Sequence, residues 1–211
     1  MKRPVSILLL LALFLSSCAL NKLFLVPYKL DRNSTFTAYV KEFDDSLTMS
    51  FNNNRKPIVK DSKNEDVDFP YTLESVFFPN SNGDTLNAWF FTPDSNYNGI
   101  TIYFLHGNAG NLIYNNLFVP PFVRAGFQVL AIDYSGFGFS EGKATRKNVL
   151  IDVNDGLAYL MNRKDIKYDK LVIYGQSLGG HLAVVVAEEN QEKIDGLIIE
   201  GAFSSHKDIA A

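Results

Sequence analysis

Apolar and polar positions divide most of the chain into segments with the periodicity of strands or helices. Residues 72–78 and 85–91 are rich in β-branched and aromatic residues and flank a turn-forming stretch, which predicts a β-hairpin. From residue 100 onward, short apolar segments of strand length alternate with longer segments of helical length. The predicted strands are 100–105, 127–132, 171–174 and 196–199, and the predicted helices lie near 112–125, 148–161 and 178–190.

The segment 148–161 carries the clearest helical pattern. Val149, Val153, Leu157 and Leu160 recur at helical spacing, so that one apolar face can pack on a sheet. A hairpin followed by alternating strands and helices predicts an α/β fold, with a mostly parallel sheet and helices on both of its faces. We assign residues 71–211 to this domain and expect ligands at the carboxyl ends of its parallel strands.

Residues 18–70 show a weaker pattern, and we expect them to form a spacer in front of the domain. The segment 36–43 fits either a helix or a strand. Residues 52–57 and 60–66 are polar and have the composition of solvent-exposed loops.

The strongest candidate for catalytic chemistry is Ser177. A short apolar run leads into Gly175-Gln-Ser177-Leu-Gly179, and a mostly apolar helical segment follows. A serine on a sharp strand-to-helix turn exposes its hydroxyl at the sheet edge, and such a turn requires neighbours without side chains. We therefore predict that Ser177 is a nucleophile on such a turn; an ordinary glycine-rich connection is the alternative.

The loop after the first parallel strand is the candidate partner of Ser177. Acyl transfer requires backbone N–H groups directed at the oxygen on which negative charge develops. The N–H of Leu178 is one natural donor. The segment Gly107-Asn108 can bring a second donor, because glycine lets the backbone face the site.

Four motifs together resemble the α/β-hydrolase superfamily, in particular its serine-aminopeptidase-like bacterial members. They are residues 106–110, 133–142, 175–180 and 200–205, in this order. The resemblance implies that Ser177 is the nucleophile, that Asn108 and Leu178 supply the oxyanion-hole N–H groups, and that His106 is structural. It also implies a small-molecule or peptide substrate with an ester, thioester or amide bond, and no cofactor.

A serine nucleophile also needs a general base and an acid. In the family that this chain resembles, acid and histidine follow the serine in loops after two further strands. Residues 201–211 leave no room for such strands, so we expect a truncated chain that lacks C-terminal strands and has little activity. His206 is a weak candidate for the base, and Glu200 and Asp208 are weak candidates for the acid.

Other interpretations stay open, so the sequence does not decide whether the chain is an enzyme. A non-catalytic lipoprotein that keeps the hydrolase scaffold is one alternative, and a complete enzyme that uses His206 is another. His181 lies one turn into the helix after Ser177, where we expect it to pack near the sheet. Asp133 ends its strand ahead of Ser177, where we expect it to order a loop. Tyr134, Phe137 and Phe139 fit either an acyl pocket or core packing.

Residues 1–17 have the build of a secretory signal peptide, with two basic residues, an apolar run and small residues before Cys18. Residues 15–18 resemble the lipobox of bacterial lipoproteins, which implies cleavage before Cys18 and acylation of its thiol. A transmembrane anchor reaching Val26 is the less favoured alternative, because Lys22 interrupts the apolar run. We expect a lipid-anchored protein of the cell envelope, in the outer membrane where there is one.

Composition excludes several other classes of protein. The chain has 20 basic and 23 acidic residues and a formal net charge of −3, whereas nucleic-acid binding requires a basic face. With a single cysteine, no disulfide can form within the chain. The histidines and the cysteine show no metal-ligand spacing, so we expect no metal.

Overall fold

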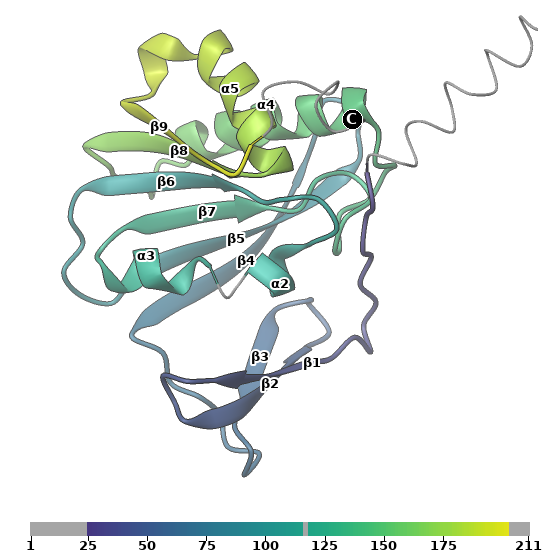
Figure 1. Cartoon of the computed structure of the whole chain (residues 1–211), viewed down its shortest axis with the longest axis vertical. Helices are drawn as coiled ribbons and strands as arrows, with labels where there is room; N and C mark the ends of the chain where they lie inside the picture. Colours follow the sequence, from purple (N-terminus) through teal and green to yellow (C-terminus); the bar gives the residue numbers. More distant parts are fainter. Residues whose placement is uncertain (1–24, 116–117, 203–211) are drawn as a thin grey trace, which may run out of the picture.

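The structure is a computed structural model that describes residues 25–115 and 118–202 (Figure 1). Its main element is a sheet of six strands in the order β4-β5-β7-β6-β8-β9. These strands are β4 (Tyr71–Pro79), β5 (Thr85–Pro93), β6 (Ile100–Leu105), β7 (Gln128–Ile132), β8 (Lys170–Gln176) and β9 (Gly196–Glu200). β5 pairs antiparallel with β4 and β7, and the other pairings are parallel. The predicted hairpin and the predicted mostly parallel sheet are therefore confirmed.

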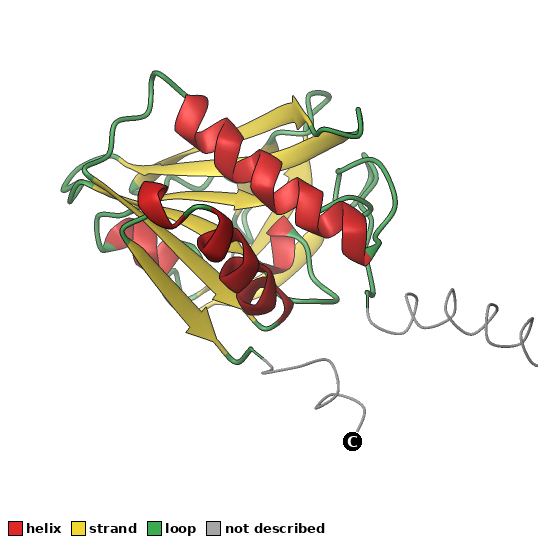
Figure 2. Cartoon of the chain, turned by 90° about the horizontal axis from the view of Figure 1, so that it is seen from above, coloured by secondary structure: helices red, strands yellow, loops and turns green. Residues whose placement is uncertain are grey.

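Helices cover both faces of this sheet (Figures 1 and 2). α4 (Arg146–Asn162) and α5 (Leu178–Glu189), which a 3₁₀ turn (Gln191–Lys193) follows, lie on one face, and α2 (Leu112–Asn115) and α3 (Pro120–Arg124) lie on the other. The prediction of one helix near 112–125 was wrong, because the described residues contain two short helices there. Proline lacks an N–H and clashes with the preceding turn, so Pro120 and Pro121 favour the start of a new helix, α3.

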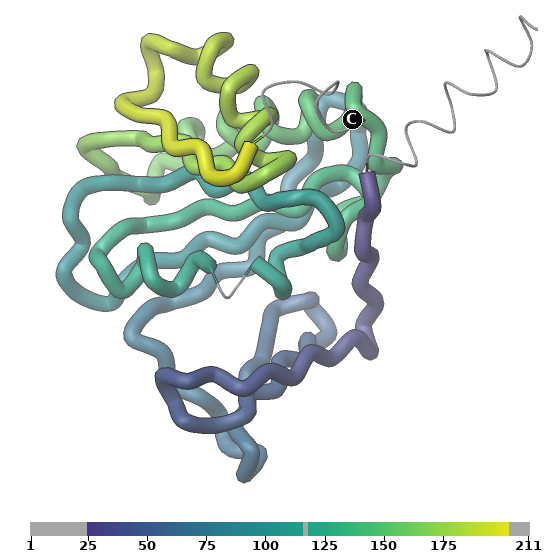
Figure 3. The backbone as a smooth tube through the Cα atoms, in the orientation of Figure 1, coloured from purple at the N-terminus to yellow at the C-terminus, as the bar shows by residue number. Residues whose placement is uncertain are grey.

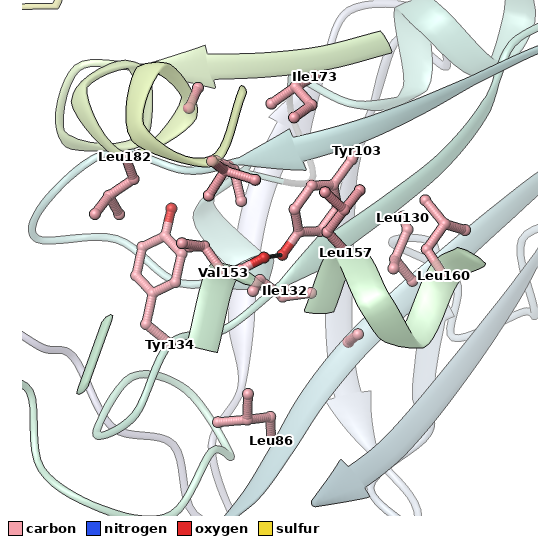
Figure 4. Packing of buried hydrophobic residues seen from close by; sticks show 14 of the residues in the cluster. Leu86, Tyr103, Leu130, Ile132, Tyr134, Val153, Leu157, Leu160, Ile173 and Leu182 are labelled. Atoms are coloured by element: carbon pink, nitrogen blue, oxygen red, sulfur yellow. Dashed lines mark hydrogen bonds between the residues drawn. The ribbon is translucent and has the colours of Figure 1, made fainter. Parts of the chain in front are cut away.

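A buried apolar cluster joins α4 and α5 to the sheet (Figure 4). Val149, Val153, Leu157 and Leu160 are all buried, as the helical spacing predicts. The Tyr103 hydroxyl crosses this layer and donates a hydrogen bond to the Val153 carbonyl at 2.8 Å. Each buried aliphatic side chain contributes about 1.5–3 kcal/mol relative to an exposed one, so this layer holds α4 firmly against the strands that carry the site.

The residues predicted to form a spacer include a second, small antiparallel sheet (Figure 1). Its strands, in the order β1-β2-β3, are β1 (Phe36–Val40), β2 (Asp45–Phe51) and β3 (Pro57–Lys60). Met49 and the side chains of Phe36 and Val59 pack into the apolar cluster on the α2–α3 face of the main sheet. The segment 36–60 is therefore packed onto the domain.

The sheet ends at β9 within the described residues, where β9 pairs with β8 alone. Leu197, Ile198 and Ile199 of β9 remain 39–46% exposed. No helix in the described part of the chain is long and apolar enough to cross a membrane.

Candidate active site

Ser177 occupies the turn between β8 and α5. β8 ends at Gln176 and α5 begins at Leu178, so Ser177 alone makes the change of direction. Its φ of 52° and ψ of −112° lie in a region that costs a residue with a side chain about 1–3 kcal/mol and that is concentrated at functional sites. Its N–H donates to the Glu200 carbonyl oxygen at 2.8 Å, which fixes the turn to the end of β9.

Gly175 and Gly179 make this turn possible. A Cβ atom on Gly175 would lie 2.3 Å from the Gly179 carbonyl oxygen, and one on Gly179 would lie 2.0 Å from the Leu105 carbonyl oxygen. Both contacts are with backbone, which cannot move aside as a flexible side chain can. The two positions therefore require glycine for steric reasons, as the sequence pattern predicts.

The loop 106–110 lies beside Ser177. A Cβ atom on Gly107 would make an ordinary contact of 3.5 Å with the Ser177 Cβ atom. The Gly107 backbone therefore lies directly beside the serine side chain. Asn108, the next residue, is exposed. Leu178 is the first residue of α5, a position whose N–H has no acceptor within the helix. The structure thus brings Ser177, Leu178 and the Gly107-Asn108 segment together at one edge of the sheet.

His106 lies in the interior behind this loop. Its ring stacks on Tyr134 at a centroid distance of 4.2 Å, and Phe137 meets it edge-on at 5.4 Å. The Nδ1 atom lies 2.7 Å from the Gly107 carbonyl oxygen, and Nε2 lies 3.5 Å from Oδ1 of Asp133. Tyr134 and Phe137 are both fully buried, so they serve in core packing around His106 and line no open acyl pocket.

The Asp133 carboxylate connects three segments around the site. Its Oδ1 accepts the N–H of Leu112 at 2.9 Å, and its Oδ2 would lie 1.8 Å from a Cβ atom on Gly138. Burial raises the pKa of the Asp133 carboxyl, and the contact with His106 opposes this rise. Asp133 thus links the 106–110 loop, the start of α2 and the 133–142 loop, as expected of a loop-ordering carboxylate.

The side chain of Glu200, the candidate acid, contacts Tyr174. Its carboxylate accepts a hydrogen bond from the Tyr174 hydroxyl, and its backbone oxygen holds Ser177. Burial, and then the bond with Glu200, raise the pKa of Tyr174 to about 12. The candidate base His206 and the candidate lipidation site Cys18 lie outside the described residues.

Sequence reasoning missed the segment 25–30, which runs along the edge of the sheet past these loops (Figure 3). The Val26 N–H donates to Oδ1 of Asn108 at 2.9 Å. The Tyr28 carbonyl oxygen accepts the N–H of Gly138 at 2.9 Å, and Leu25 is buried in the core. Backbone hydrogen bonds hold most of this segment, and they leave no signature in the side chains.

Among the described residues, no group of three or more His, Cys, Asp or Glu side chains is placed to hold a metal ion. At this edge of the sheet the Ser177 hydroxyl lies near the backbone of Gly107-Asn108 and of Leu178. Such an arrangement suits nucleophilic attack on a carbonyl carbon with stabilisation of the resulting oxyanion.

Comparisons with known proteins show the family and the fold of the chain. Residues 100–210 match a family model described as the alpha/beta hydrolase fold. The chain is 33% identical over 138 residues to the alpha/beta hydrolase domain-containing protein WAV2 of Arabidopsis thaliana, which covers 65% of this chain and 45% of the relative. It is 33% identical over 145 residues to the uncharacterized protein YfhR of Escherichia coli (strain K12), with coverages of 67% and 51%.

Among solved structures, a carboxyl esterase from Bacillus coagulans superposes with a TM-score of 0.52 and 22% identity. The superposition covers 61% of this chain and 44% of the esterase. The chain thus spans about half the length of the curated relatives that it matches.

Proposed function

Because the chain belongs to the α/β-hydrolase family, we propose that it is a serine hydrolase with Ser177 as its nucleophile. The observation that carries the proposal is the conformation of Ser177, a non-glycine residue at φ 52° between two glycines that tolerate no Cβ atom. A serine held in this way exposes its hydroxyl beside the Gly107-Asn108 backbone, where a bound carbonyl group would meet both.

The proposed reaction proceeds through an acyl-enzyme. The Ser177 Oγ atom attacks the carbonyl carbon of an ester, thioester or amide, while its proton passes to a base. The N–H groups of Asn108 and Leu178 stabilise the oxyanion, and each such donor is typically worth about 3–4 kcal/mol in the transition state. The leaving alcohol, thiol or amine departs with the proton, and water then hydrolyses the acyl-enzyme.

The general base is the part of this mechanism with the least support among the described residues. His106 is buried, with Nδ1 beside a carbonyl oxygen and Nε2 facing Asp133, so it is placed as a structural residue. A serine triad without its histidine loses on the order of a million-fold in turnover. We therefore propose that the 211-residue chain turns substrate over slowly, and the role of His206 stays a prediction.

Fluorophosphonate labelling of the full chain tests the nucleophile. We expect labelling that is lost in Ser177→Ala and retained in Ser95→Ala, a matched change at an exposed loop serine. Added imidazole supplies a base from solution and should speed labelling of the wild-type chain alone. A folded protein that stays unlabelled with imidazole present would contradict the proposal.

A carboxylic ester is the substrate class to test first. The Bacillus coagulans structure is described as a carboxyl esterase, and its resemblance supports this choice over amides and thioesters. We expect slow hydrolysis of p-nitrophenyl acetate or butyrate that rises with imidazole in the wild-type chain and not in Ser177→Ala. Equal rates in the two proteins would remove Ser177 from the reaction.

A non-catalytic protein that keeps the hydrolase scaffold is the second candidate. It is motivated by the missing general base, because the buried His106 is held by Asp133 and Tyr134 and is not placed to serve as one. A stable, monodisperse chain without labelling or esterase activity, with or without imidazole, would support this alternative. Retained labelling at Ser177 alone would exclude it.

We also propose that the chain is anchored in the cell envelope through lipid on Cys18. The lipobox-like residues 15–18 support this proposal. Radiolabelled palmitate should be incorporated when the full chain is expressed in bacteria, and Cys18→Ser should abolish the incorporation. Incorporation that survives this substitution would contradict the proposal.

A further inference from the structure

An apolar cavity of about 100 Å³ lies between the small N-terminal sheet and the main domain, on the α2–α3 face. Its lining comes from six elements or their flanks, and includes Phe36, Leu47, Met49, Phe69, Tyr71 and Ile113. In Figure 1 this region lies between β1–β3 and the helices α2 and α3. The cavity therefore belongs to a part of the molecule that is distinct from the Ser177 turn.

Two charged side chains stand at the mouth of the cavity. Arg124 of α3 and Glu42 form an ion pair in which Nη1 lies 2.8 Å from Oε2, and both side chains are partly exposed. A guanidinium group has five N–H donors in a fixed plane, and the contact with Glu42 uses Nη1. The remaining donors leave Arg124 able to bind a second carboxylate.

Tyr71 brings a hydroxyl group to the same cavity. Its side chain is 8% exposed, and its ring stacks on Phe69 at 5.1 Å. Among the described residues, no hydrogen bond to the Tyr71 hydroxyl is found, and this hydroxyl is not one of the fully buried polar atoms without a partner. It is therefore open to solvent at the cavity, where a ligand oxygen could replace water as the acceptor of its hydrogen bond.

The charges of Arg124 and Glu42 interact electrostatically with the Tyr71 hydroxyl. Burial raises the pKa of Tyr71 to about 12, and Arg124 and Glu42 shift the pKa in opposite directions. Tyr71, Arg124 and the apolar lining thus form one environment, with a cation and a hydroxyl donor next to an apolar space.

We propose that this cavity binds a short fatty acid, with its carboxylate on Arg124 and the Tyr71 hydroxyl and its hydrocarbon tail between the small sheet and α2. A carboxylate is the group that an arginine and a hydroxyl donor satisfy together. The tail meets Phe36, Leu47 and Met49, which offer no polar atoms beyond their backbone.

The size of the cavity sets the length of the tail. A water-sized group needs about 10–15 Å³, so the cavity holds roughly seven to ten such groups. Hexanoate and octanoate match this range, whereas acetate leaves most of the apolar space empty. Hexadecanoate is too long to be enclosed.

Isothermal titration calorimetry of the full chain with octanoate tests the proposal. We expect saturable binding with a Kd on the order of 0.1–1 mM, weaker binding of octan-1-ol and no measurable binding of acetate. Tyr71→Phe removes the hydroxyl and keeps the ring, and Arg124→Gln removes the cation. Each should weaken octanoate binding about tenfold, whereas Glu42→Gln removes a competing carboxylate and should strengthen it.

Matched controls separate this site from binding elsewhere. Tyr39→Phe is the same chemical change on the solvent face of β1, and Arg32→Gln removes an exposed cation from a loop; both should bind octanoate like the wild type. Ser177→Ala should also leave the Kd unchanged, so the test does not depend on the proposed hydrolase. No saturable octanoate binding by folded protein, equal affinity for octan-1-ol, or unchanged affinity in Tyr71→Phe and Arg124→Gln would overturn the proposal.

Discussion

The Ser177 turn and the small N-terminal sheet are stabilised by different kinds of contact. At the turn, backbone meets backbone so closely that a Cβ atom on Gly179 would lie 2.0 Å from the Leu105 carbonyl oxygen. At the small sheet, side chains such as Phe36 and Met49 meet the domain and leave a cavity of about 100 Å³ between them. The turn allows one geometry, whereas the sheet is fixed by packing that side chains can readjust.

This difference predicts how each region responds to substitution. A substitution at the turn should lower both the reactivity of Ser177 and the stability of the fold, because the same close backbone contacts position Ser177 and pack the start of α5 on β6. A change in the small sheet should act on stability or ligand binding and leave the reactivity of Ser177 intact.

Gly179→Ala tests the turn and should have the largest effect. The new methyl group would overlap backbone atoms of Leu105 and His106, so we expect a loss of about 3 kcal/mol or more in the free energy of unfolding. Fluorophosphonate labelling of Ser177 should disappear at temperatures where the variant remains folded. Urea denaturation and labelling measure the two effects.

Gly196→Ala is the matched control on the neighbouring strand β9. A Cβ atom there would make an ordinary contact of 3.5 Å with Val172, so stability and labelling should stay close to those of the wild type. Similar losses in the two variants would mean that the close backbone contacts do not define the turn.

Met49→Ala tests the small sheet. Met49 is buried against the domain, and truncation of a buried methionine costs about 2–5 kcal/mol. Lys56→Ala, at the exposed position just before β3, should cost about 0.5 kcal/mol or less. Labelling of Ser177 should be unchanged in Met49→Ala well below its unfolding midpoint. Loss of labelling in the folded variant would show that the two regions are coupled.

The sequence predicted most of the main sheet because its signals are local. Alternating strands and helices, the turn residues between β4 and β5, and the apolar face of α4 all depend on neighbours within a few positions. The small sheet escaped prediction because its strands lie among polar and turn-forming residues and carry few apolar side chains. The alternation of Phe36, Ala38 and Val40 with Thr37 and Tyr39 in β1 is a strand pattern. It covers only five residues, and the aromatic Tyr39 on its outer face weakens it.

The candidate site also has features that the sequence indicated and features that it did not. The glycines around Ser177 indicated the turn because glycine is required there for a steric reason that the sequence records. The hydrogen bond from Val26 to Asn108 and the contact between Glu200 and Tyr174 join residues distant in the chain. No local pattern marks such pairs, so they were visible only in three dimensions.

Asp133→Asn tests the carboxylate that orders the loops around the turn. Burial raises the pKa of Asp133 in the folded state. Its pH-dependent contribution to the free energy of unfolding is therefore fully present below the unfolded pKa of about 3.8, and it is lost as pH rises through the folded pKa. The stability difference between wild type and Asp133→Asn should therefore shift in favour of the wild type as pH falls from neutral, as measured by urea denaturation. We expect the variant to lose about 1–3 kcal/mol at low pH, because the amide keeps the acceptor for the Leu112 N–H but places an NH2 group where the second carboxyl oxygen packs against Gly138.

Asp165→Asn provides a control of opposite sign. Arg163 lowers the pKa of this exposed carboxyl through a hydrogen bond, so the contribution of Asp165 is present above its unfolded pKa and is lost as pH falls through the folded value. The two difference curves should therefore slope in opposite directions. Parallel curves would show that burial does not dominate at Asp133.

Asn108→Ala should have the smallest effect and sharpens the contrast between backbone and side chain. The substitution removes the Oδ1 acceptor that holds the Val26 N–H and keeps the backbone N–H proposed as an oxyanion donor. Because an exposed hydrogen bond contributes about 0.5–1.5 kcal/mol, we expect a loss of stability in this range and a labelling rate within a few-fold of the wild type. A loss of labelling as large as in Gly179→Ala would mean that the side chain of Asn108, and not its backbone, serves the site.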